Sequence, residues 1–250
     1  METWPHFTDK RIQEFERIEQ GLFRKVLEAH SKTPIECLYL ELGIVPFRFK
    51  LMTRRILYYQ TIMHRDDDEL TKKVLLSQKQ TMYNGDVYQQ IRQDMTQLGV
   101  TDLDITSKSN ESLKEFIKKK ALAIAYEYLY DIATSHSKVH HEIYKNLDGI
   151  PYLSDTRFSS EQSKLLFKFR TRMADVRNNF RNNYACTKCP LCGVQEDTQE
   201  HMINCIIIRR HHEASSMEYS DIFTNDSDVL YDAVRELEHI VDIRSKLLDV

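Results

Sequence analysis

The sequence predicts an all-α protein, with a bundle-like body of several helices and a small Cys/His knuckle near the C-terminus. Its 250 residues include only 6 Gly and 5 Pro, too few for the closely spaced turns of an all-β sandwich or barrel. Apolar residues recur at three- and four-residue intervals over long stretches, which is typical of amphipathic helices. Four of the five Cys lie within residues 186–205, and this clustering favours metal binding over a disulfide framework.

Residues that typically end or begin helices separate the predicted helices. Gly43 ends a short apolar segment over 35–42, and Pro46 opens a helix at a position where its missing N–H does no harm. Three aspartates at 66–68 suit the positive N-terminal end of a helix dipole. Residues 100–109 are interpreted as a polar linker. The predicted helices cover residues 8–30, 46–64, 66–83, 86–98, 110–135, 159–173 and 227–248.

The clearest chemical signal is a pattern of four ligand types, C-x2-C-x8-H-x3-C. Two thiolates two residues apart can wrap one ion through a tight turn, and Gly193 can take the positive φ that such a turn often needs. Thr198 can cap a short helix, on which positions i and i+4 share a face. Such a set matches a closed tetrahedral Zn²⁺ site, in which no position stays open for catalysis. The predicted ligands are Cys189, Cys192, His201 and Cys205.

Two other interpretations of this segment stay open. Cys186 lies three residues before Cys189, so Cys186-x2-Cys189 is a second, overlapping pair. We favour the pair Cys189 and Cys192, because Pro190 and Gly193 supply turn chemistry. Alternatively, the thiols are a chance cluster of reduced, buried Cys, since free Cys is among the most buried residue types.

A basic stretch over 164–184 leads into the knuckle. It contains six cations and one acid, Asp175, with aromatic residues between them. Cations neutralise phosphates and aromatic faces stack on unpaired bases, so the stretch is a candidate site for RNA or single-stranded DNA. Alternatively, the stretch is an ordinary helix whose charged face is solvated and whose aromatic residues pack into the core. The predicted nucleic-acid contacts are Lys164, Lys168, Arg170, Arg172, Arg177 and Arg181.

The composition and the absence of certain motifs argue against several classes of protein. The net charge of −3 excludes a uniformly basic nucleic-acid binder. No apolar run approaches the roughly 18 residues of a membrane helix, and the N-terminus has no signal-peptide pattern. We therefore expect an intracellular protein, nuclear or cytoplasmic, that is neither secreted nor membrane-bound. No phosphate loop, nucleophile elbow or H-E-x-x-H motif is present, so no enzymatic activity is expected.

The knuckle residues 189–193, 196–201 and Cys205 resemble the zinc knuckle at the C-terminal end of non-LTR (LINE-like) retrotransposon reverse transcriptases. Residues 165–173 resemble the segment before that knuckle, and residues 40–46 with the following helix resemble the region just beyond the polymerase domain. The family's aromatic-x-Asp-Asp turn and upstream aspartate are absent here. The resemblance implies a post-polymerase portion of an RNA-directed DNA polymerase, one that helps to grip RNA template and target DNA without catalysis.

Together these features predict a non-catalytic binder of RNA or single-stranded DNA. The alternative is a zinc-stabilised helical module that binds a protein through apolar grooves or through its acidic end, where residues 213–250 hold ten acids and three basic residues. The predicted regions are an N-terminal helical region over 1–99, a helical region over 110–184 ending in the basic stretch, the knuckle over 186–208 and an acidic C-terminal helix over 213–250.

Overall fold

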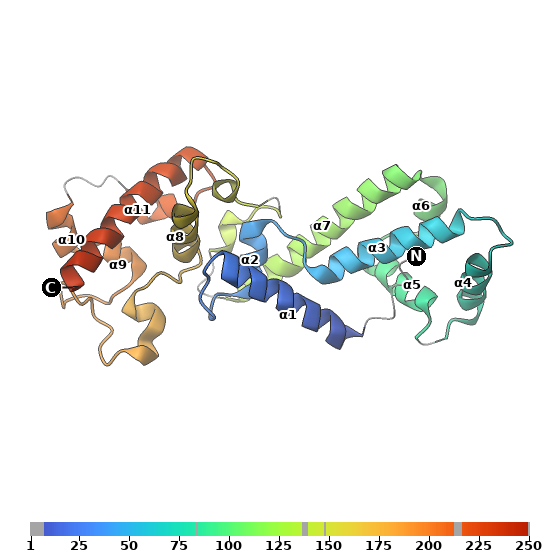
Figure 1. Cartoon of the computed structure of the whole chain (residues 1–250), viewed down its shortest axis with the longest axis horizontal. Helices are drawn as coiled ribbons and strands as arrows, with labels where there is room; N and C mark the ends of the chain where they lie inside the picture. The colour runs from blue at the N-terminus through green and yellow to red at the C-terminus, as the bar shows by residue number, and fades with distance from the viewer. Residues whose placement is uncertain (1–7, 84, 137–139, 148, 213–216, 250) are drawn as a thin grey trace. The chain divides into compact units, whose positions relative to one another are not determined.

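The computed structural model describes residues 8–83, 85–136, 140–147, 149–212 and 217–249 (Figure 1). These residues form eleven α-helices and four short 3-10 helices without a β-strand, which confirms the all-α class. Their one extended pairing outside helices is an isolated antiparallel bridge between Lys188 and Glu196. The chain divides into two compact units, one made of Met1–Gln20 with Ile44–Leu129, the other of Gly21–Gly43 with Tyr130–Val250.

The first unit is organised around the pairing of two helices from different parts of the sequence. Ile56 and Ile91 are fully buried, and Arg55 donates to the carboxylate of Asp94 with an Nε–Oδ2 distance of 2.5 Å. This ion pair joins the helices over 47–63 and 87–98, which pack against each other more extensively than any other two helices of the unit. The helices of this unit are the first part of α1 (Asp9–Val26), α3 (Phe47–Met63), α4 (Leu70–Thr81), α5 (Val87–Leu98), α6 (Asp102–Ser107) and most of α7 (Asn110–Ser135).

Two sequence-based expectations in this unit are wrong. The aspartates at 66–68 precede a helix instead of opening it, since α4 begins at Leu70. The expected polar linker over 100–109 contains the helix α6. Thr101 caps that helix through a capping box, in which its hydroxyl accepts from the Asp104 N–H and the Asp104 carboxylate accepts from the Thr101 N–H. The Thr-x-x-Asp spacing was visible in the sequence.

The second unit is built around the C-terminal helix. Leu230, Val234 and Leu237 recur along one buried face of α11, which packs against α8, α9, α10 and η4 (Figure 1). The predicted bounds of this helix are confirmed. The elements of the unit are α2 (Ile35–Leu42), η1 (His141–Ile143), η2 (Pro151–Leu153), α8 (Ser160–Arg170), η3 (Arg177–Asn183), α9 (Gln199–Asn204), α10 (Ile206–His211), η4 (Tyr219–Phe223) and α11 (Ser227–Leu248).

A buried ion pair connects the early and late segments of this unit. The Arg170 Nε lies 3.0 Å from Oε1 of Glu41, and both side chains are fully shielded from solvent. Tyr144 and Tyr152 donate their hydroxyls to the two oxygens of the same carboxylate, at 2.7 and 2.9 Å. Arg170 also donates to the carbonyls of Ile222 and Thr224. Every strong polar group of this cluster is thereby paired, as buried charges require.

Within the described part of the chain, none of the helices combines the length and the apolar character that crossing a bilayer would need.

Candidate metal centre

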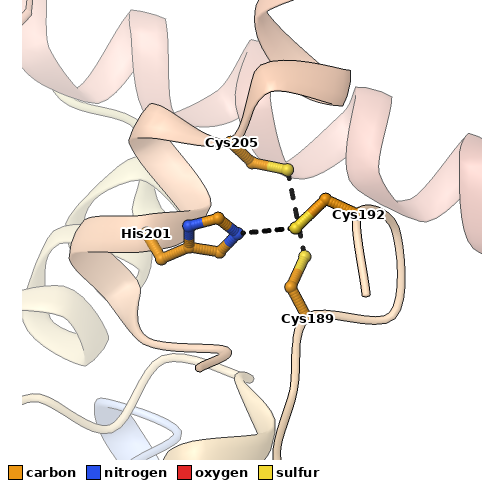
Figure 2. Close-up of side chains that lie close together, drawn as sticks. All are labelled: Cys189, Cys192, His201 and Cys205. Atoms are coloured by element: carbon orange, nitrogen blue, oxygen red, sulfur yellow. Dashed lines mark hydrogen bonds between the residues drawn. The ribbon is translucent and has the colours of Figure 1, made fainter. Parts of the chain in front are cut away.

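Four side chains from the C-terminal third converge on one point. Each offers one ligand atom, and these atoms all lie within 4.8 Å of one another (Figure 2). Cys189 Sγ and Cys205 Sγ are 3.9 Å apart, and Cys192 Sγ is 3.3 Å from Nε2 of His201. Three sulfurs and one imidazole nitrogen at this spacing could hold a metal ion, as the ligand pattern predicted.

A tight turn brings the first two sulfurs together. The Gly193 N–H donates to the Cys189 carbonyl at 2.9 Å, and Gly193 adopts the left-handed φ of 67° that closes the turn. The Cys189 N–H donates to the Gln195 carbonyl at 2.8 Å, so the chain doubles back on itself beside the bridge of Lys188 and Glu196. Local backbone pairing therefore positions both thiols on the same side of the turn (Figure 2).

Two short helices present the other two ligands. Thr198 caps α9, and its hydroxyl accepts a hydrogen bond from the His201 N–H at 3.0 Å. Cys205 lies four residues after His201, at the junction of α9 and α10. The spacing of four places imidazole and thiol on one side, where they face the turn (Figure 2).

The surroundings favour different charge states at the two thiols of the turn. Burial raises the pKa of Cys189 to about 11, whereas the backbone N–H groups of Gln195 and Val194 lower the pKa of Cys192 to about 6. Nδ1 of His201 lies 2.7 Å from Oε1 of Gln195. This contact orients the ring so that Nε2 faces the sulfurs, as a second partner of a metal-bound histidine does.

The structure distinguishes between the two overlapping Cys pairs. Cys189 and Cys205 are buried, while Cys186 is exposed and lies outside the converging group. Cys37, which sits elsewhere in the chain, is buried in the core. The favoured pair, Cys189 with Cys192, is therefore the one that the fold brings to the centre.

Asp197 ties this centre to the C-terminal helix. Its carboxylate is completely buried and accepts both ends of the Arg244 guanidinium, at 2.8 and 2.7 Å. The same carboxylate accepts from the Arg177 N–H at 2.7 Å. Sequence reasoning missed both Asp197 and Arg244. They lie 47 residues apart, and no periodic pattern links positions at that separation.

The basic stretch does not form one continuous cationic face. Arg170 is the clearest departure from expectation, because its guanidinium is buried against Glu41. It cannot contact phosphate, and its assignment as a nucleic-acid contact was wrong. Lys164 is paired with Glu28 and Glu161, at 2.7 and 3.1 Å. Arg172 is half-buried and contacts the His140 ring through Nη2.

The other three predicted cations are half-buried or exposed. Lys168 is half-buried, and Arg181 is exposed and donates to Asn178. Arg177 lies over the Tyr184 ring, with 5.4 Å from its guanidinium carbon to the ring centroid. Its Nη1 also reaches the carbonyl of Lys188, at 3.4 Å. Arg177 is therefore in direct contact with the knuckle segment.

Two of these three cations, Lys168 and Arg177, border a hollow of about 550 Å³. Lys168, Arg177 and Tyr184 line it from one part of the chain, and Pro190 lines it from the knuckle turn. α11 contributes Arg244 and two apolar side chains, Val241 and Leu248. The hollow therefore combines cations, an aromatic ring and an apolar wall next to the metal centre.

In comparisons with known proteins, no family model, curated protein or solved structure matches this chain.

Proposed function

We propose that the centre holds Zn²⁺ in a structural role. A set of three thiolates and one imidazole is soft and suits tetrahedral coordination, which zinc favours. The ion would supply four bonds that link the turn to α9 and α10. With all four positions filled by protein, the chain would use the ion for rigidity and not for chemistry.

We further propose that the chain binds RNA or single-stranded DNA without catalysis, as the post-polymerase portion of a retrotransposon-type RNA-directed DNA polymerase. The observation that supports this most is the hollow beside the knuckle, where Lys168, Arg177 and Tyr184 meet. Lysine and arginine neutralise phosphates, and tyrosine offers a face on which any base can stack. The link to reverse transcriptases depends on the sequence resemblance alone.

The buried Asp197 carboxylate, which binds both Arg244 and the Arg177 N–H, supports this role. Arg244 is neutralised by Asp197, so it contributes a rigid wall and little free charge. Arg177 has its backbone N–H bound to the same carboxylate while its side chain reaches the Tyr184 ring. The cation that would contact phosphate is therefore anchored through its main chain, which lowers the entropy cost of binding.

The test removes the three accessible cations together, in the variant Lys168→Ala, Arg177→Ala, Arg181→Ala. On single strands the slope of log affinity against log salt falls by about 0.7 for each lost phosphate contact, so it should flatten by about 2. Affinity for 12-nucleotide oligo(U) and oligo(dT) should fall at low salt. Fluorescence anisotropy at several salt concentrations measures both quantities.

The matched control removes the same charge elsewhere, through Lys114→Ala, Lys118→Ala, Lys119→Ala on exposed positions of α7. This control should keep most of the affinity. Equal losses in both variants would show that only overall charge matters and would contradict the assignment. A wild-type chain that binds no oligonucleotide at any salt would end the nucleic-acid proposal and favour the protein-binding module.

A further inference from the structure

The hollow beside the knuckle adjoins a second one. The second has a volume of about 380 Å³ and is lined by His30, Phe180 and neighbouring residues. Lys168, Asp175 and Tyr184 line both hollows. The two therefore meet at these three side chains and form one groove, which we call the knuckle groove.

Tyr184 stands at the meeting point with much of its surface open. Its relative exposure is 41%, high for a large aromatic residue. Arg177 packs over the ring, and the Tyr184 N–H donates to the Arg181 carbonyl at 3.2 Å, which fixes the backbone. In the second hollow, Phe180 packs against His30 with ring centroids 4.6 Å apart. Aromatic side chains thus lie both where the two hollows meet and in the second hollow.

The charges along the groove are mixed and placed close to the aromatic ring. Lys168 and Arg177 are cations, and Asp175 is an exposed acid that both hollows share. A second exposed acid, Glu28, lines the second hollow and is paired with Lys164. Cations suit phosphates, whereas a carboxylate accepts hydrogen bonds from the exocyclic amines of bases. A ligand with phosphates alone would be repelled by Asp175, while a nucleotide can satisfy both kinds of group.

We propose that the knuckle groove binds unpaired nucleotides, with one base stacked on Tyr184 and the adjoining phosphates on Lys168 and Arg177. This inference depends on the proposed nucleic-acid binding and adds the position of the base and phosphates in the groove and a preference for single strands over duplexes. Concave sites of about 300–1,000 Å³ enclose small ligands, and each hollow falls in this range. Bases within a duplex are already stacked on their neighbours and cannot offer a face to Tyr184. The groove therefore selects single strands over duplexes.

The experiment compares the wild-type chain with Tyr184→Leu and Tyr184→Phe. Stacking of one base on an aromatic side chain predicts that Tyr184→Leu weakens binding of single strands about 5- to 150-fold. Tyr184→Phe keeps the ring and should bind as the wild type does. The ligands are 12-nucleotide oligo(U) and oligo(dT), which distinguish RNA from DNA, and a 12-base-pair DNA duplex, whose affinity should not change. Zinc content and circular dichroism report whether each variant is folded.

A second measurement needs no variant. Irradiation of the wild-type chain with oligo(U) that carries 4-thiouridine should crosslink Tyr184 or its neighbours in the knuckle groove, located by mass spectrometry. Crosslinks confined to other surfaces would overturn the inference. So would equal single-strand affinities of wild type and Tyr184→Leu. In both of those cases the chain still binds nucleic acid and the proposed function stands, whereas absence of any binding by the wild type would end the function itself.

Discussion

At the residue scale, the two thiols of the knuckle turn differ in how readily they become metal ligands. Cys192 has a pKa near 6, because backbone N–H groups stabilise its thiolate, whereas burial holds the pKa of Cys189 near 11. A thiol binds metal as the thiolate, so an incoming ion must displace the proton of Cys189. Metal binding therefore releases protons, and the apparent affinity falls as the pH falls.

We expect the purified chain to contain about one zinc per molecule, and His201→Ala and Cys189→Ala to contain almost none. Each variant removes one of four ligands from a closed site. Lowering the pH from 7 to 5 should release zinc from the wild type, because the thiolates regain protons. Elemental analysis measures the content, and a colorimetric chelator measures the release.

The matched control is Cys186→Ala, which removes an exposed thiol three residues from Cys189 and outside the converging group. It should keep the full zinc content. Loss of zinc in this control, with retention in Cys189→Ala, would reverse the choice between the overlapping pairs. A wild-type chain without metal would contradict the zinc proposal.

At the element scale, side-chain caps mark the beginnings of several helices. The Ser159 hydroxyl accepts from the Gln162 N–H at the start of α8, and the Asp226 carboxylate accepts from two N–H groups at the start of α11. These bonds satisfy donors that have no partner within a helix. They also place negative charge at the positive end of the helix dipole when the capping residue is an aspartate.

Asp226→Ala should lower the free energy of unfolding by about 1 kcal/mol, because it leaves two N–H groups of α11 without their cap. Asp249→Ala is the control. It removes an aspartate from the opposite end of α11, where negative charge opposes the dipole, so stability should stay the same or rise slightly. Urea unfolding followed by circular dichroism measures both. Equal destabilisation by the two changes would contradict the capping argument.

At the scale of the whole molecule, the buried pair of Glu41 and Arg170 joins segments 129 residues apart. It connects α2 to α8 within the second unit, and two tyrosine hydroxyls complete the carboxylate's hydrogen bonds. Such a pair adds little net stability over apolar residues, but removal of one partner leaves an uncompensated buried charge.

Arg170→Met should therefore destabilise the chain by about 3–5 kcal/mol, since Glu41 stays buried without its cation. The double change Glu41→Gln, Arg170→Met removes both charges and should recover part of that loss. Lys246→Met is the control at an exposed pair with Asp242, where about 0–1 kcal/mol is expected. Denaturant unfolding compares the variants. A double variant no more stable than Arg170→Met would contradict the charge argument.

Local patterns predicted much of this structure. The bounds of the helices at 110–135 and 227–248 follow from apolar periodicity within each segment. The four clustered ligands follow from spacing within one turn and one pair of short helices. Where a local signal was misread, as for α6, the relevant group was the capping residue Thr101, whose partner Asp104 lies three residues away. All of these features depend on interactions between near neighbours, which the linear order specifies.

Whether each cation of the basic stretch is buried or accessible could not be predicted in the same way. Arg170 and Arg177 belong to one basic stretch, yet the first is enclosed by Glu41 and two tyrosines while the second borders the hollow beside the knuckle. The link between Asp197 and Arg244 and the grouping of 21–43 with 130–250 likewise had no signal in the sequence. Burial and ion pairing depend on which distant segment packs against a side chain, and only the folded chain brings those segments together.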